Sequence, residues 1–303
     1  MLMLKVKDML MVGLMVLMMA SCTEDIVIDV EDGERLIGVA ATFTDEMKCH
    51  EAVLSYTDDF YNNNEDIRMV TGATVFVTDN IDTIYYIEDA TQPGHYFTAP
   101  VAGKKKTMYR LCITAPDING EIVDLIAESY LPDNVDCIDS LVLKPYNGLN
   151  DSIPTVFFGD TIEFLYPYFQ SLTDSTIVYM PMISKNDTLL TDTLNDMRMV
   201  IPMAGYAGYY VNGSEMQMAN KEIPVYYFSK SQLRIGDVVR VDLYSIGEDY
   251  IYFYYSLMMS TGSNPMMGAP ANVMTNIQPT DKAVGWFLTA SVVSAETIFD
   301  DRY

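Results

Sequence analysis

The amino-acid sequence predicts a mainly β protein with two domains and one or two short helices. Short runs of alternating apolar and polar residues recur along the chain, and clusters of Asn, Asp, Gly and Pro separate them, which is typical of strands and turns. Only residues 248–259 have the composition expected of a helix. The chain has 303 residues, and one hydrophobic core rarely serves more than about 250–300 residues. Two domains are therefore expected.

Residues 35–136 are expected to form the first domain, an immunoglobulin-like β-sandwich. Three segments of strand length alternate clearly between apolar and polar residues: 73–78, 83–87 and 108–113. Turn-forming pairs separate the strands at intervals of roughly ten residues, as in small sandwiches. These pairs are Asp79-Asn80, Pro93-Gly94, Gly103-Lys104 and Asn119-Gly120.

Residues 137–303 are expected to form a second, larger β-rich domain. Its predicted helix, residues 248–259, carries Glu248 and Asp249 in the first turn, where the helix dipole favours acidic side chains. Gly262 follows as a stop signal. Asn-Gly turn signals at 147–148 and 212–213 accompany predicted strands at residues 161–166, 176–182, 197–203, 223–229 and 238–244.

Residues 1–21 have the composition of a secretory signal peptide. Lys5 and Lys7 precede an apolar run at residues 9–19, and small residues follow it. The run is too short for a transmembrane helix, which needs about 20 residues, and no other segment is long and apolar enough to be one. The sequence Met19-Ala20-Ser21-Cys22 resembles the bacterial lipobox, in which the cysteine thiol is acylated before cleavage.

Cys22 is therefore expected to be the first residue of the mature chain and to carry a lipid anchor with several acyl chains, such as palmitate. Residues 22–34 are expected to form a tether. The acidic stretch Thr23-Glu24-Asp25 resembles the signal that directs some lipoproteins of Bacteroidota to the cell surface. The alternative is an ordinary signal peptide followed by an incidental cysteine.

The formal net charge of -24 at pH 7 excludes nucleic-acid binding through phosphate neutralisation. The charge favours solubility, and attraction of cations or basic partners is the alternative explanation. Besides Cys22, the chain has Cys49, Cys112 and Cys137, an odd number that allows one disulfide at most. None of them has metal-ligand spacing. Cys112 lies in an apolar strand pattern and is expected to be a small core residue.

No catalytic motif is found, and the chain is expected not to be an enzyme. A nucleophile needs a neighbouring base, usually His, and the chain has only His50 and His95. A Cys49–His50 dyad is disfavoured because adjacent strand residues point to opposite faces. The sequence also has no GxSxG, HExxH or glycine-rich phosphate loop. A pair of catalytic carboxylates remains an open alternative, since nothing in the sequence singles one out.

The sequence suggests two alternative metal sites, and no cofactor is expected. A polar loop offers hard oxygen ligands of the kind that calcium prefers, although it lacks the glycine of an EF-hand; these ligands are Asp58, Asp59, Asn62, Asn64 and Asp66. A solvated loop is the simpler explanation. Thioethers suit copper(I), but methionine also fills irregular cores. The Met-x-Met pairs lie at residues 180–182, 197–199 and 216–218.

Tyr206, Tyr209 and Tyr210 lie among glycines and are the expected contact patch, because tyrosine combines a large rigid ring with a polar hydroxyl. Asp-Ser and Asp-Thr pairs also recur, and they resemble the O-glycosylation signal of some Bacteroidota. The same pairs are common in turns, so only exposed ones are candidates. The candidate acceptors are Thr83, Ser152, Thr161, Ser175, Thr188 and Thr193.

Several motifs together resemble the outer-membrane lipoproteins of Bacteroidota that form the domain-of-unknown-function 4249 family. They include Cys22 with its acidic follow-on, residues 72–79, Gly94-His95-Tyr96, and the junction of Leu131-Pro132 with residues 138–141. Gly103 with residues 109–113, and Asn264-Pro265 with Asn276-Ile277, complete the set. The methionine-rich residues 266–270 depart from the pattern, since an aromatic residue is expected there.

The resemblance implies a first domain like the transthyretin or carboxypeptidase-regulatory sandwich, and a partnership with a TonB-dependent outer-membrane transporter. It supplies no catalytic residues. The expected function is therefore that of a non-catalytic, lipid-anchored accessory protein of the outer membrane, exposed at the cell surface, that takes part in ligand capture or assembly. The alternatives are a free-standing adhesin or structural lipoprotein, a metal-binding protein, and an enzyme.

Overall fold

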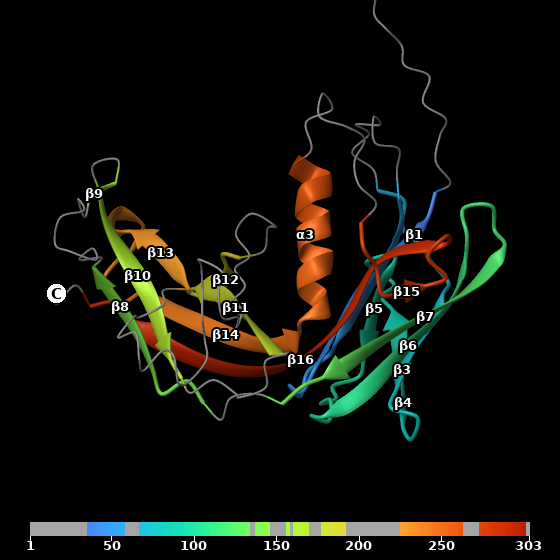
Figure 1. The fold of residues 1–303 in the computed structure, drawn as a ribbon, viewed down its shortest axis with the longest axis horizontal. Helices are drawn as coiled ribbons and strands as arrows, with labels where there is room; N and C mark the ends of the chain where they lie inside the picture. The colour runs from blue at the N-terminus through green and yellow to red at the C-terminus, as the bar shows by residue number, and fades with distance from the viewer. Residues whose placement is uncertain are drawn as a thin grey trace, which may run out of the picture. The chain divides into compact units, whose positions relative to one another are not determined.

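The computed structural model describes residues 35–57, 67–133, 137–145, 156–157, 160–169, 177–191, 225–262 and 273–300. The predicted mainly β fold is confirmed (Figure 1). The strands before residue 135 are β1 (Ile37–Thr44), β2 (Glu51–Tyr56), β3 (Thr74–Thr78), β4 (Thr83–Glu88), β5 (His95–Thr98), β6 (Thr107–Pro116) and β7 (Ile122–Leu131).

The later elements are also mostly strands. They are β8 (Ser140–Pro145), β9 (Val156–Phe157), β10 (Asp160–Tyr168), β11 (Ile177–Lys185), β12 (Thr188–Leu189), β13 (Tyr226–Ser229), η1 (Lys230–Gln232), β14 (Val238–Gly247), α3 (Asp249–Gly262), β15 (Ile277–Gln278) and β16 (Ala283–Ile298). The predicted helix at residues 248–259 is α3, which ends later than expected because it includes Gly262. The predicted strand at residues 197–203 and both Asn-Gly turns lie outside the described residues.

Most described strands belong to one sheet, in the order β12-β11-β14-β16-β1-β2-β5-β4-β3-β6-β7-β15. The long strand β16 joins its two halves, because residues 283–290 pair in parallel with β1 and residues 291–298 pair antiparallel with β14. Gly285 lies in this joint with φ +118, and a Cβ there would overlap the Val39 carbonyl oxygen. The predicted boundary between residues 136 and 137 stays a prediction.

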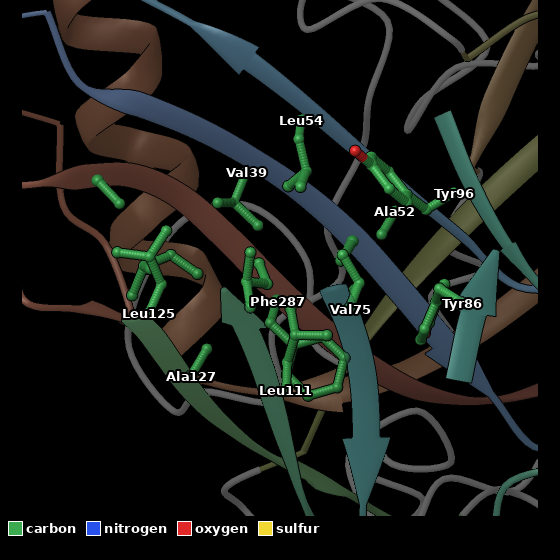
Figure 2. Close-up of a cluster of buried hydrophobic side chains, with 14 of the residues drawn as sticks. Val39, Ala52, Leu54, Val75, Tyr86, Tyr96, Leu111, Leu125, Ala127 and Phe287 are labelled. Atoms are coloured by element: carbon green, nitrogen blue, oxygen red, sulfur yellow. The ribbon is translucent and has the colours of Figure 1, made fainter. Parts of the chain in front are cut away.

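The first half of the sheet encloses a hydrophobic core (Figure 2). Every second residue of a strand points inward; in β6 these are Tyr109, Leu111, Ile113 and Ala115, all buried. Phe287, from β16, is fully buried in the same core. The core therefore depends on residues that are far apart in the sequence.

Side chains connect β7 to β16, which completes the enclosure of this core. Ser129 Oγ accepts a hydrogen bond from the backbone N–H of Thr289 at 3.1 Å. Asn276 Oδ1 accepts from the N–H of Phe287, and its Nδ2 donates to the Phe287 carbonyl, both at 2.9 Å. The same Nδ2 also donates to the carbonyl of Glu128 at 3.3 Å. The Asn276 side chain thus links β7 to β16, in place of direct backbone hydrogen bonds between the two strands.

The second half of the sheet is covered on both faces. One face of β11 and β14 packs on the small sheet β13-β10-β8, through a core that includes Leu165, Phe228 and Ile183. The opposite face packs against α3, through a cluster that includes Ile251 and Trp286. In β11 the residues from 177 to 181 are consequently all buried.

Candidate functional site

Several predicted site residues lie outside the described residues. They are the lipidation site Cys22, the calcium-loop residues Asp58, Asp59, Asn62, Asn64 and Asp66, the tyrosines Tyr206, Tyr209 and Tyr210, and the glycosylation candidates Ser152, Ser175 and Thr193. Thr161 lies in β10. Thr83 and Thr188 are exposed at the first positions of β4 and β12, so both meet the exposure that a glycosylation acceptor needs.

His50 is a buried structural residue. Its Nε2 lies 2.8 Å from the carbonyl of Val101, and its Nδ1 accepts from the N–H of Thr44 at 3.4 Å. These partners place the proton on Nε2. Burial lowers the pKa of His50, and the positive charge of Lys48 lowers it further. Cys49 is exposed while His50 is buried, so the two neighbours lie on different sides of the backbone.

The segments around His95 that carry the family resemblance have structural contacts. Glu88 accepts from the N–H groups of Gly72 at 2.8 Å and Gly94 at 3.1 Å. The hydroxyl of Tyr96 donates to the carbonyl of Val70 at 2.9 Å, and His95 Nδ1 lies 2.6 Å from a carboxylate oxygen of Glu51. These contacts fasten the segment before β3 to the hairpin of β4 and β5.

The described methionine pair also packs as core. Met180 is buried and Met182 half-buried in the cluster beneath α3, and the hydroxyl of Thr191 donates to the Met182 sulfur at 3.9 Å. Among the described residues, no group of three His, Cys, Asp or Glu side chains is placed to hold a metal ion. The other two pairs, at 197–199 and 216–218, lie outside those residues.

The strongest candidate site is a group of exposed hydrophobic side chains on β4, β6 and β7. Strand periodicity sends their neighbours into the core, as with Tyr86 in β4 and Leu125 in β7. The group itself therefore points away from the core, on the other side of the sheet. We call it the outer face, and it consists of Tyr85 (58% exposed), Ile87 (69%), Met108 (49%), Ile122 (68%), Ile126 (45%) and Tyr130 (46%).

Cross-strand pairing connects side chains of the outer face across the sheet. Tyr85 lies opposite Phe76 of β3, with ring centroids 5.6 Å apart. Phe76 in turn lies opposite Cys112, and Cys112 lies opposite Ile126. Met108 and Tyr130 form a second apolar pair. The prediction that Cys112 is a core residue is wrong: it is only half-buried on the outward side, and this partial burial raises the pKa of its thiol.

Charged groups on the same side of the sheet are few and mostly paired. Arg110 donates to one carboxylate oxygen of Glu128 from Nε at 3.0 Å and from Nη2 at 2.6 Å. Asp124 accepts a hydrogen bond from the hydroxyl of Thr114 at 2.6 Å, and a neutral hydroxyl leaves its charge uncompensated. The outer face is therefore apolar with a local excess of negative charge.

Sequence reasoning missed the outer face because the strand that carries half of it does not alternate between apolar and polar residues. In β7, Val123, Leu125 and Leu131 point toward the core, while Ile122 and Ile126 have the opposite orientation. Apolar residues on both faces of one strand are the signal that would have found this surface. The same pattern is equally typical of a strand that is buried on both sides.

A second aromatic cluster lies on β8 and β10. Lys144 Nζ is 4.5 Å from the ring centroid of Tyr166, and it donates to the hydroxyl of Tyr168 at 3.0 Å. Phe164 lies beside Tyr166, with centroids 6.3 Å apart. Tyr166 is buried, so this cluster is packed, in contrast to the outer face.

The sheet and its outer face define a mainly β protein with a surface suited to binding. No catalytic centre is found among the described residues. The chain belongs to the family described as domain of unknown function DUF4249, whose model matches residues 23–296. No curated protein matches the chain. In the part of the chain that the structure describes, none of the helices has the length and apolar character needed to cross a membrane.

One solved structure to which the chain is similar is the crystal structure of the chicken CNTN1 FN1-FN3 domains. The match covers 72% of this chain and 65% of that chain, at 9% identity and a TM-score of 0.25. The chain thus spans less than two thirds of that protein, and at this TM-score the likeness carries no argument about function.

Proposed function

We propose that this protein is a non-catalytic, lipid-anchored accessory protein of the outer membrane that binds a TonB-dependent transporter. Three features support the proposal. The first 22 residues have the order of a lipoprotein signal that ends at Cys22. The acidic stretch after Cys22 favours a location at the cell surface. The outer face offers a contact surface for a protein partner.

The outer face is the observation that carries the proposal. Burying an Ile, Met or Tyr side chain contributes about 1.5–3 kcal/mol, and six such side chains are exposed on three strands. Contiguous apolar surface of this kind is rare on monomeric proteins and usually marks an interaction site. Tyrosine and isoleucine on a rigid sheet also lose little conformational entropy on binding.

A pull-down tests the proposal. Full-length tagged protein is expressed in its native cells and recovered from detergent-solubilised outer membrane, and its partners are identified by mass spectrometry. A β-barrel transporter is expected at a fixed ratio to the protein. Ile126→Lys, which places a charge on the outer face, is expected to abolish recovery, because a buried unpaired charge costs several kcal/mol.

Ile235→Lys is the matched control. Ile235 is 74% exposed, in the turn before β14 and away from the outer face, so this variant is expected to recover the transporter as well as the native protein does. Recovery that is unaffected by Ile126→Lys contradicts the assignment of the outer face. A surface-exposed protein with no transporter partner favours the adhesin or structural alternative. The Cys22→Ser variant tests the lipid anchor, because it is expected to lose the acyl chains.

A further inference from the structure

The edge of β7 that borders the outer face is only partly paired. On one side β7 pairs with β6 along its whole length, from Ile122 to Leu131. On the other side β15 pairs only with Ile126 and Ala127. Within the described residues, no strand pairs with β7 between Ile122 and Leu125 on this second side.

β15 is short. Gln278 is its last residue, and Pro279 follows. The chain then turns, with the N–H of Lys282 donating to the Pro279 carbonyl at 3.1 Å. The chain's own strand therefore does not extend along the first part of β7.

The register fixes which backbone groups face this open edge. The N–H of Asp117 donates to the carbonyl of Glu121 at 2.7 Å, at the turn between β6 and β7. In an antiparallel pair such bonds recur at every second residue. Val123 and Leu125 consequently bond to β6, and the N–H and C=O groups of Ile122 and Asp124 point away from it.

Two other contacts agree with this register. Pro116, which has no N–H to donate, lies opposite Ile122, as expected where the two strands exchange no bond. Glu128 lies an even number of residues after Ile122, so the backbone groups of both residues point to the same side of β7. The carbonyl of Glu128 points away from β6, since it accepts a hydrogen bond from Asn276. Ile122 and Asp124 thus present two donors and two acceptors in the spacing of a strand edge.

We propose that this edge accepts one β-strand from a protein partner, and that every second residue of the strand is apolar and basic in turn. The inference deepens the proposed function, on which it rests for the identity of the partner. An added strand places side chains beside Ile122 and Asp124, while β15 occupies the position beside Ile126. Strand addition combines backbone hydrogen bonds with side-chain selectivity. Ile122 selects an apolar residue, and Asp124 selects Lys or Arg two positions further along the added strand, on the same face of the sheet.

The charge of the protein argues against a second copy of the chain as the occupant. Pairing of two β7 edges brings Asp124 of each copy close together. Like charges opposite each other destabilise a pair of strands, and each chain carries a net charge of -24. A basic strand from another protein relieves this repulsion.

A peptide assay tests the edge directly. The probe is a fluorescent peptide with threonine at every second position and valine and lysine in turn at the positions between, so that valine and lysine share one face. Its anisotropy is measured with the lipid-free mature chain. Ile122→Pro removes an N–H that points away from β6, so it costs no hydrogen bond between β6 and β7. It is expected to weaken binding about tenfold, since one backbone hydrogen bond and its strand geometry are lost.

Ile122→Val is the matched control, because it keeps the N–H and a β-branched side chain, and it is expected to bind as the native chain does. Thermal unfolding of both variants checks that they fold. The proposal is overturned if the native chain does not bind the peptide, if Ile122→Pro binds equally well, or if the same peptide with glutamate in place of lysine binds equally well. A dimer of the chain that Ile122→Pro dissociates also overturns it.

Hydrogen exchange on the complex separates this inference from the proposed function. In the purified transporter complex, the amides of Ile122 and Asp124 are expected to exchange at least about tenfold more slowly than in the free protein, because they become hydrogen-bonded. Recovery of the transporter without this protection overturns strand addition alone. Failure to recover a transporter overturns the proposed function alone, and the peptide assay then decides the inference.

Discussion

The two halves of the large sheet use apolar residues in different ways. In β11, residues 177–181 are all buried, because the small sheet covers one side and α3 covers the other. In β7 the inward residues are buried, but Ile122 and Ile126 remain exposed. Nothing among the described residues covers them as α3 covers β11. The same sequence pattern therefore serves folding in one region and is free for binding in the other.

The comparison predicts a large difference between equivalent substitutions. Ile183 of β11 and Ile246 of β14 are fully buried on opposite faces of the second half. Ile→Ala at either position is expected to destabilise the protein by about 2–5 kcal/mol, because each leaves a cavity. Ile126→Ala on the outer face is expected to cost less than about 1 kcal/mol. Urea unfolding of the three variants measures these free energies.

A cost for Ile126→Ala that equals the cost at Ile183 would break the comparison, since it means that the chain itself covers the outer face. A small loss of stability for Ile246→Ala together with a large loss for Ile183→Ala would instead show that the two faces of the second half contribute unequally. In that case α3 adds little to the stability of the sheet, and the second half depends on its sandwich core.

The joint between the two halves gives the next largest expected effect. Asn276→Ala leaves the buried N–H of Phe287 and two carbonyls without the partner that they have in the native protein. Such unsatisfied groups cost about 1–3 kcal/mol. Asn276→Asp keeps the acceptor for the Phe287 N–H and loses the donor, so an intermediate loss is expected. Thermal unfolding ranks the variants, and equal stability of all three proteins contradicts the bridging role.

The strand positions were predictable, and their order was not. Alternation located β3 and β4 within one residue at each end, and β6 with its end three residues too early, because alternation reports a local preference. The pairing of β1 with β16 joins residues 37 and 283, and no local pattern encodes such a contact. Gly285, which this joint requires, is indistinguishable in the sequence from a glycine in a turn.

The candidate site was harder to predict than the fold. Composition does not distinguish Ile126, which is exposed, from Ile183, which is buried, because burial depends on what another segment covers. The predicted tyrosine patch and calcium loop lie outside the described residues and stay predictions. Cys112 illustrates the same difficulty, since its apolar neighbours alternate between the core and the outer face.

The two histidines extend the comparison to the two sides of the first half of the sheet. His50 is buried, with its ring centroid 4.5 Å from that of Phe43. His95 is on the outward side and pairs with Glu51. Protonation of His50 places a charge in the core and puts a second donor opposite the N–H of Thr44, which explains why burial lowers its pKa.

This lowered pKa predicts a pH-dependent loss of stability, the smallest of the three effects because it involves one group. The unfolded chain binds a proton at His50 near the ordinary pKa of about 6.5, and the folded protein binds it only at lower pH. Stability is therefore complete above about pH 6.5 and falls as the pH decreases toward the folded value. Urea unfolding between these limits measures the slope. His50→Gln is expected to remove this part of the slope, and His95→Gln to leave it. If the slope of stability against pH is unchanged in His50→Gln, another titrating group causes the pH dependence.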